Sequence, residues 1–236
     1  MIDLAICADP AVSVLLARHP RVSRTETGDV AGIIFYQGSW RREVRVGDAT
    51  AEQFGLVELM DNNPVVCADT VSVPAPVSTL ALIAVGPVAW ASLVQETPSV
   101  ISSHAVDGGE LSSFLTSAGW DGGANLHVEP VDLDGVVAIT AMVEIRTPDD
   151  LDDIDALYEE RFGRSFFVRR DEDSVWDPSL VRGTPYAVYR LLLAPDAPNS
   201  LLTIRVLADL KGKAGASQMV HAMNVMAGFE ETLGIA

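Results

Sequence analysis

Apolar positions near the end of the chain follow a helical period. In the segment 208–236, Ala216, Met219, Val220, Met223 and Met226 recur at steps of three, one, three and three residues, which places them on one face of a helix. A loop with two lysines and two glycines precedes this stripe, and a glycine at 234 stands where a helix would end. We therefore predict one amphipathic helix over 216–233 that packs back onto the N-terminal part of the chain.

The rest of the chain alternates between strand-like and helix-like patterns. Residues 30–36 and 40–46 alternate as two strands of a hairpin. The remaining predicted strands are 2–6, 64–68, 136–145 and 201–207. The remaining predicted helices are 10–19, a short one beginning with a capping-box-like pattern at 48–52, 80–88 and 148–161.

Composition limits the class of protein. The chain has 236 residues, of which 48% are hydrophobic and 21% are charged, with a net charge of −17. This balance favours a globular protein with an ample core and argues against a nucleic-acid partner or an anionic membrane surface. The longest apolar stretch, 79–94, is interrupted by Gly86 and Pro87 and is too short for a membrane span. With only Cys7 and Cys67 and no secretory signal, we expect a soluble cytoplasmic protein.

Charged clusters have ordinary explanations. Arg41, Arg42 and Arg45 give the hairpin the densest positive charge of the chain, and a solvated strand face is favoured over an anion site. The aspartates between 149 and 153 fall in the first turns of a predicted helix, where the helix dipole favours carboxylates. We predict no metal site among them.

Several short motifs occur in the order that they have in a known enzyme family. They are Phe-Gly-Leu-Val-Glu-Leu at 54–59, Leu-His-Val-Glu-Pro at 126–130, Val-Arg-Gly-Thr-Pro-Tyr at 181–186 and the tail that begins at Lys213. Over 54–236 the chain resembles N-acetyl-γ-glutamyl-phosphate reductases and the related aspartate-semialdehyde dehydrogenases, most strongly after residue 125. Several weak motifs in one order are more specific than any one of them alone.

The resemblance implies an α+β fold. It implies a mixed, largely antiparallel sheet with helices on one face, like the C-terminal domain of glyceraldehyde-3-phosphate dehydrogenase, plus a small α/β remnant at the N-terminus. We place the remnant of the nucleotide-binding domain at 1–75 and the dimerisation and substrate domain at 76–236. The first 53 residues are too few for a complete dinucleotide-binding domain, which takes about 130 residues.

The chemistry of the family is not retained at the matching positions. The first strand leads into Cys7-Ala-Asp-Pro10 rather than a glycine-rich turn, and Asp9 would repel a cofactor phosphate. Pro76 stands at the position of the catalytic cysteine and Asp107 at that of the catalytic histidine. An alternative is a shifted alignment that makes Cys67 the nucleophile, because Asn63-Pro-Val-Val-Cys67 resembles the family's Asn-Pro-Gly-Cys. The protein would then be a true oxidoreductase like the reductases of this family.

Two functions from different classes follow. In the first, the protein is a catalytically degenerate binding or assembly subunit that uses no cofactor. It forms a homodimer or homotetramer through the C-terminal sheet, or associates with an active enzyme. In the second, the former substrate cleft carries out acid/base chemistry on a small carboxylate-bearing metabolite. The candidate catalytic residues are His104, Asp107, His127 and Glu129, and the candidate substrate-binding residues are Arg182, Lys213, Gln218, His221 and Asn224.

Overall fold

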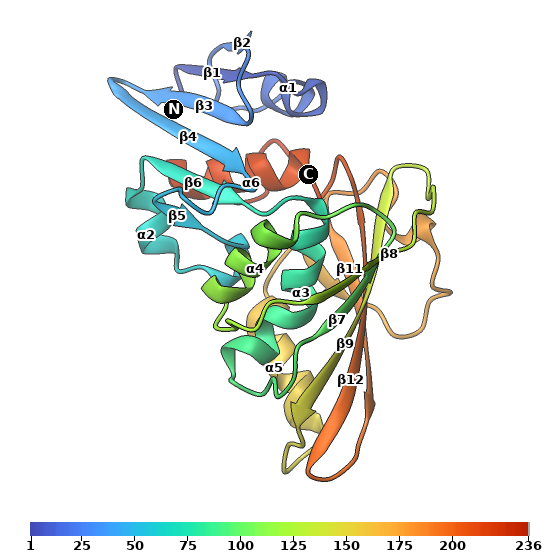
Figure 1. Cartoon of the computed structure of the whole chain (residues 1–236). Helices are drawn as coiled ribbons and strands as arrows, with labels where there is room; N and C mark the ends of the chain where they lie inside the picture. Colours follow the sequence, from blue (N-terminus) through green and yellow to red (C-terminus); the bar gives the residue numbers. More distant parts are fainter. Residues whose placement is uncertain (236) are drawn as a thin grey trace.

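Two six-stranded sheets form the frame of the molecule, which is a computed structural model that describes residues 1–235 (Figure 1). In the first sheet the order is β2-β1-β3-β4-β6-β5. Strand β3 runs antiparallel to both β1 and β4, and the other neighbours are parallel. The strands are β1 (Leu4–Cys7), β2 (Thr25–Thr27), β3 (Ile33–Gln37), β4 (Trp40–Val46), β5 (Gln53–Phe54) and β6 (Thr70–Val73).

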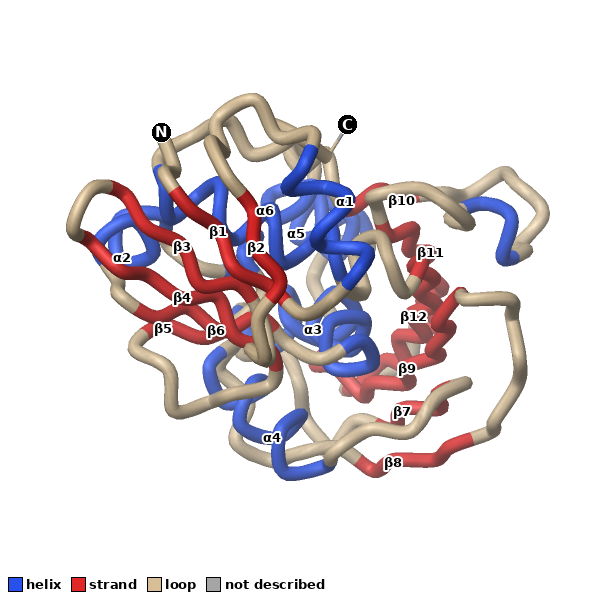
Figure 2. The backbone as a smooth tube through the Cα atoms, turned by 90° about the horizontal axis from the view of Figure 1, so that it is seen from above, coloured by secondary structure: helices blue, strands red, loops and turns tan. Residues whose placement is uncertain are grey.

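Three helices pack against the buried face of this first sheet, namely α1 (Pro10–Ala17), α2 (Asn62–Cys67) and α6 (Ala216–Ala227). Figure 2 shows the sheet with α6 beneath it and α1 at its side. Because successive strand residues point to opposite faces, Ile33, Phe35 and Val44 all reach the same core. The apolar stripe of α6, including Met219 and Met223, fills the other side of that core.

The second sheet has the order β10-β11-β12-β9-β7-β8. Its centre is the antiparallel pair of β9 and β12, and only the two edge pairs are parallel. The strands are β7 (Ser99–Ser102), β8 (Asn125–Val128), β9 (Val136–Arg146), β10 (Val168–Arg170), β11 (Ala187–Ala194) and β12 (Asn199–Asp209).

Helices α3 (Pro76–Trp90), α4 (Gly108–Ser117) and α5 (Asp152–Phe162) cover one face of the second sheet (Figure 1). Every residue of α3 from Val77 to Ala89 is buried, as expected for a helix that is apolar on all sides. Two short 3₁₀ turns, η1 (Val57–Leu59) and η2 (Pro178–Leu180), complete the elements. The predicted fold class, α+β with helices on one face of a mixed sheet, is confirmed.

Four local predictions are wrong, each for a physical reason. Residues 48–52 form a turn, because Asp48 accepts hydrogen bonds from both the amide (2.9 Å) and the hydroxyl (2.6 Å) of Thr50. The segment 64–68 is largely the helix α2 rather than a buried strand. Helix α6 ends six residues early, because Gly228 closes it with φ +69°. Arg42 is buried rather than solvated.

None of the helices within residues 1–235 is long and apolar enough to cross a membrane.

Candidate functional site

A cavity of about 520 Å³ opens where α1, α3 and α6 begin. It is lined by the turn 8–10 before α1, by 30–32, by the turn before α3 and by the start of α6. This is the place that the family resemblance assigns to the cofactor and the nucleophile. Among the residues that line it, Asp9 is the one that carries an ionisable side chain. The cavity is therefore mostly apolar and contains few groups for catalysis.

The protein's own carboxylates occupy two of the helix N-termini beside this cavity. Asp9 accepts hydrogen bonds from the amides of Ala11 (2.6 Å) and Val12 (3.3 Å) at the start of α1. Glu110 accepts one from the amide of Ala75 (2.8 Å), which is the cap of α3. Burial raises the pKa of Glu110. A dinucleotide phosphate would meet these carboxylates instead of free amide groups, so the residues present do not fit the family's cofactor.

The nucleophile position is also unsuited to covalent chemistry. Pro76 is the first residue of α3, and its ring carries no nucleophilic atom. Cys67 does not replace it, because this exposed residue is the last of α2 and is followed by strand β6 rather than by a helix. Cys67 is not among the residues that line the cavity.

Gln218 contributes the most distinctive polar group of the cavity. Its side chain is 1% exposed, and its Nε2 donates to the carbonyl of Pro74 (3.1 Å) and to Oγ1 of Thr79 (2.8 Å). The Pro74 carbonyl can only accept, which fixes the orientation of the amide. Its buried Oε1 therefore has no hydrogen-bond partner within the described residues.

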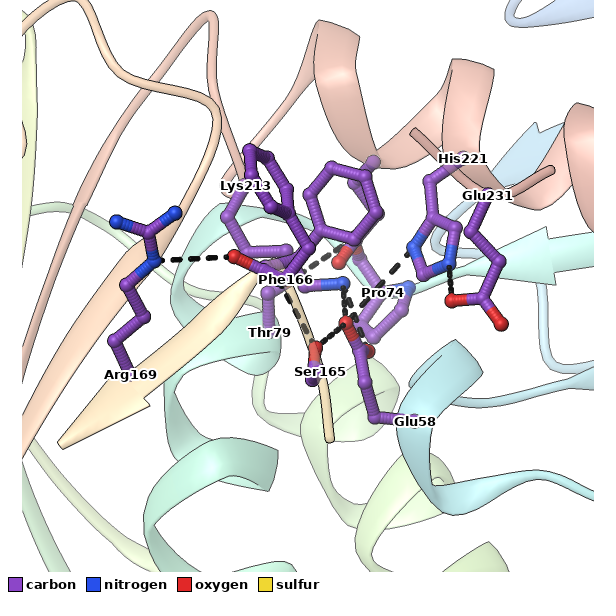
Figure 3. Close-up of polar contacts among 11 residues, drawn as sticks. Glu58, Pro74, Thr79, Ser165, Phe166, Arg169, Lys213, His221 and Glu231 are labelled. Carbon is purple, nitrogen blue, oxygen red and sulfur yellow. Dashed lines mark hydrogen bonds and ion pairs between the residues drawn. The ribbon is translucent and has the colours of Figure 1, made fainter. Parts of the chain in front are cut away.

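Next to this cavity lies a buried cluster of charges from distant parts of the chain (Figure 3). The Nζ of Lys213 donates to both carboxylate oxygens of Glu58, at 2.7 and 2.8 Å, and the two side chains are 0% and 5% exposed. His221 Nε2 contacts Glu231 at 2.9 Å, and its ring stacks on Phe167 with centroids 4.2 Å apart. The cluster joins η1, the loop before α6, α6 itself and the terminal turn.

The protonation of the cluster follows from its burial. Burial alone would raise the pKa of Glu58, but the neighbouring Lys213 ammonium group lowers it below its ordinary value. Burial lowers the pKa of His221, and its hydrogen bond to Glu231 opposes this shift only in part. A neutral imidazole that donates from Nε2 to Glu231 matches this direction. That same hydrogen bond is the main cause that lowers the pKa of Glu231.

We expect the free energy of unfolding to fall as the pH drops below 6.5, the ordinary pKa of histidine. His221 and His19 both have lowered pKa values in the folded state through burial, so the unfolded chain binds more protons and acid favours it. Below pH 4.5 the lowered pKa values of Glu58 and Glu231 add to the loss. Urea unfolding at several pH values from 7 to 5 measures how steeply the free energy of unfolding changes with pH. His221→Gln should reduce this slope by about half, because one of the two histidines is then missing. An unchanged slope in His221→Gln would contradict this assignment.

The structure separates the predicted catalytic residues from the cavity and the charge cluster. His104 hydrogen bonds through Nδ1 to its neighbour Ser103 (2.9 Å). Asp107 is the cap of α4 and accepts from two amides there. His127 and Glu129 do lie together, with 3.4 Å between Nε2 and Oε1, but both side chains are about two thirds exposed, at 66% and 64%.

The predicted binding residues are divided between three places. Gln218 lines the cavity, and Lys213 and His221 belong to the charge cluster. Asn224 is fully buried and ties the terminal turn to α6 through the carbonyls of Glu231 (3.0 Å) and Leu233 (2.9 Å). Arg182 is exposed on the other side of the loop that carries Lys213, and it pairs with Asp134 at 3.4 Å.

The comparisons agree with this architecture. The two sheets and the buried α3 define a semialdehyde-dehydrogenase-like fold. Over 97% of this chain and 98% of the other, it superposes on aspartate-semialdehyde dehydrogenase II from Vibrio cholerae with a TM-score of 0.69 and 12% identity. At that identity the likeness concerns the fold alone.

The sequence itself resembles one enzyme more specifically. Over 100 residues it is 31% identical to N-acetyl-γ-glutamyl-phosphate reductase from Bacillus mycoides and 28% identical to that of Bacillus cereus strain 03BB102. Each match covers 42% of this chain and only 28% of the relative's length. No protein-family model matches the chain. The expected resemblance to this family is confirmed.

The sequence patterns did not identify Glu58, Glu110 and Glu231 as site residues. Glu58 lies in the family-like segment 54–59, so that segment was the available signal. Glu110 had the likeness of Glu110-Leu111 to the family's Glu-Ile as its signal. Glu231 had none, because it meets its partner His221 only when the terminal turn packs against α6.

Proposed function

We propose that this protein is a binding or assembly subunit on a semialdehyde-dehydrogenase-like scaffold and that it carries out no NADP-dependent reduction. The observation that carries the proposal is the state of the former active site. The residue at the start of α3 is Pro76, and the carboxylates of Asp9 and Glu110 fill the neighbouring helix ends. Hydride transfer needs a bound cofactor and a positioned nucleophile, and this cavity is built for neither.

The surface that suits assembly is the face of the second sheet that lies opposite α3, α4 and α5 (Figure 1). Three adjacent strands place Met142 of β9, Thr203 of β12 and Leu192 of β11 side by side. Leu192 is 68% exposed, and Leu201 on β12 is 45% exposed. An open sheet face with exposed leucines is suited to pairing with a second sheet through a two-fold axis.

Calorimetry with NADPH and NADP⁺ tests the first half of the proposal. We expect no saturable heat of binding for either nucleotide. The reason is that the carboxylates of Asp9 and Glu110 would lie against the cofactor phosphates without compensating cations. A micromolar dissociation constant for either nucleotide would overturn the claim that the protein is not a reductase.

Light scattering coupled to size-exclusion chromatography tests the assembly half. We expect a mass of twice the 25.2 kDa chain, or a higher multiple. Leu192→Asp should shift it towards the single chain, because a buried unpaired carboxylate opposes sheet packing. The matched control is Val14→Asp on α1, where the side chain is 63% exposed and far from this sheet face in sequence; it should leave the mass unchanged. A monomeric wild-type protein would contradict self-association.

A further inference from the structure

A second cavity, of about 510 Å³, lies between the two units of the fold. One wall is formed by Leu15 of α1, by Arg18 directly after this helix and by the terminal turn. The other is formed by loops 134–135, 182–185 and 209–212 beside the second sheet. It shares only Leu210 with the cavity at the start of α3. Small-molecule sites occur preferentially at such boundaries and have volumes of about 300–1,000 Å³.

Several basic side chains line this cleft, although the chain as a whole is acidic. The protein has 33 acidic and 16 basic residues, and its only two lysines are Lys211 and Lys213. Arg18, Arg182 and Lys211 all line the cleft. Three cations in one cavity create a local potential opposite in sign to that of the acidic surface.

The two carboxylates of the cleft, Asp134 and Asp209, reduce its formal charge from +3 to +1 (3 − 2), so it stays positive within an acidic protein. Asp209 is 8% exposed and uses one oxygen to accept the amide of Gly183 (2.7 Å) and the other to accept the amide of Lys211 (2.7 Å). Asp134 pairs with Arg182 at 3.4 Å, but its side chain is 84% exposed, so the pair is weak. The ion pairs within residues 1–235 include none with Lys211.

The walls of the cleft are held in place before any ligand binds. Asp209 links loop 182–185 to loop 209–212 through its two hydrogen bonds. These loops are in direct contact, since a Cβ on Gly212 would lie 2.1 Å from the carbonyl oxygen of Thr184. Gly183, at φ +70°, borders open space. A site with fixed walls loses less conformational entropy when it binds a ligand.

We propose that this cleft binds a small dianion that carries a phosphate group or two carboxylates. The guanidinium groups of Arg18 and Arg182 match the paired oxygens of either anion, and Lys211 adds a compact point charge. Because Arg18 directly follows α1 and Arg182 lies in the loop that leads into β11 of the second sheet, the ligand bridges both units of the fold. This site is independent of the cofactor question and of assembly through the sheet.

Calorimetric titration of the full chain with inorganic phosphate and, separately, with succinate tests the proposal. We expect saturable one-to-one binding of at least one of them, with affinity that falls as salt is added. Arg182→Ala and Lys211→Ala should each weaken binding by about tenfold, the effect of losing one charge-assisted contact. Arg24→Ala is the matched control, because Arg24 is an exposed arginine paired with Glu26 outside the cleft.

Each outcome decides the matter. Preferential binding of phosphate supports a phosphate-bearing ligand, and preferential binding of succinate supports a dicarboxylate. Absence of saturable binding by either probe overturns the proposal. Equal weakening by Arg24→Ala and Arg182→Ala also overturns it, because it would indicate general screening of charge. Urea unfolding of each variant establishes that a loss of binding does not reflect a loss of fold.

Discussion

Replacing Lys213 with methionine should lower the free energy of unfolding by about 3–5 kcal/mol, the range found when one partner of a buried ion pair is removed. Lys213 is 0% exposed, and its Nζ is the bidentate partner of Glu58, which is itself only 5% exposed. Without the ammonium group, the Glu58 carboxylate must either remain charged without a partner or take up a proton. Urea unfolding followed by circular dichroism measures the loss.

The neighbouring lysine provides the matched control. Lys211 lies two residues away and is exposed, so Lys211→Met should change stability by no more than about 0.5 kcal/mol. The double variant Lys213→Met with Glu58→Met should recover most of the stability, because no buried charge is left. If the double variant is as unstable as the single one, packing rather than charge would explain the effect.

The elements that the sequence predicted well are those with a strong local period. The stripe of α6 and the long strands β9 and β12 have clear patterns, and each is found close to its predicted position. The end of α6 was misplaced because two glycines, Gly228 and Gly234, were both suitable as terminators. Both adopt a positive φ, so the sequence alone could not rank them.

The candidate site was harder to predict because its contacts join distant parts of the chain. Glu58 and Lys213 are separated by 155 positions, and Gln218 and Thr79 by 139. No periodicity encodes such pairs. The prediction that Arg42 is solvated failed for a related reason. Its partners are backbone carbonyls, which every residue has, so no side-chain pattern in the sequence marks them.

These contacts also give the family-like motifs a structural role. The segment 54–59 supplies Glu58, the tail supplies Lys213 and Gln218, and the start of α3 supplies Thr79. The motifs meet around one buried region, where each satisfies the polar groups of another. Since the fold needs these contacts, the residues have a structural role whether or not a reaction occurs nearby.

A second large effect is expected at Arg42, which is 1% exposed. Its guanidinium donates to the carbonyls of Val65 (3.1 Å), Val66 (2.8 Å) and Ala68 (2.7 Å), and also to that of Met226. These carbonyls lie at the C-terminal ends of α2 and α6, where a helix leaves its last acceptors unpaired and carries partial negative charge. One side chain therefore caps two helices and joins them to β4.

Arg42→Met should consequently cost about 3–5 kcal/mol of unfolding free energy, since several buried carbonyls each lose a partner at about 1–3 kcal/mol and partly recover through water. Arg41→Met is the control, because this adjacent side chain points to the opposite face of β4, is 49% exposed and pairs with Glu43. Arg42→Lys should fall between the two, as an ammonium group keeps the charge but cannot reach all the carbonyls at once. Equal urea midpoints for Arg42→Met and Arg41→Met would refute the proposal that Arg42 caps both helices. The apolar contacts of α6 would then account for the stability of this region.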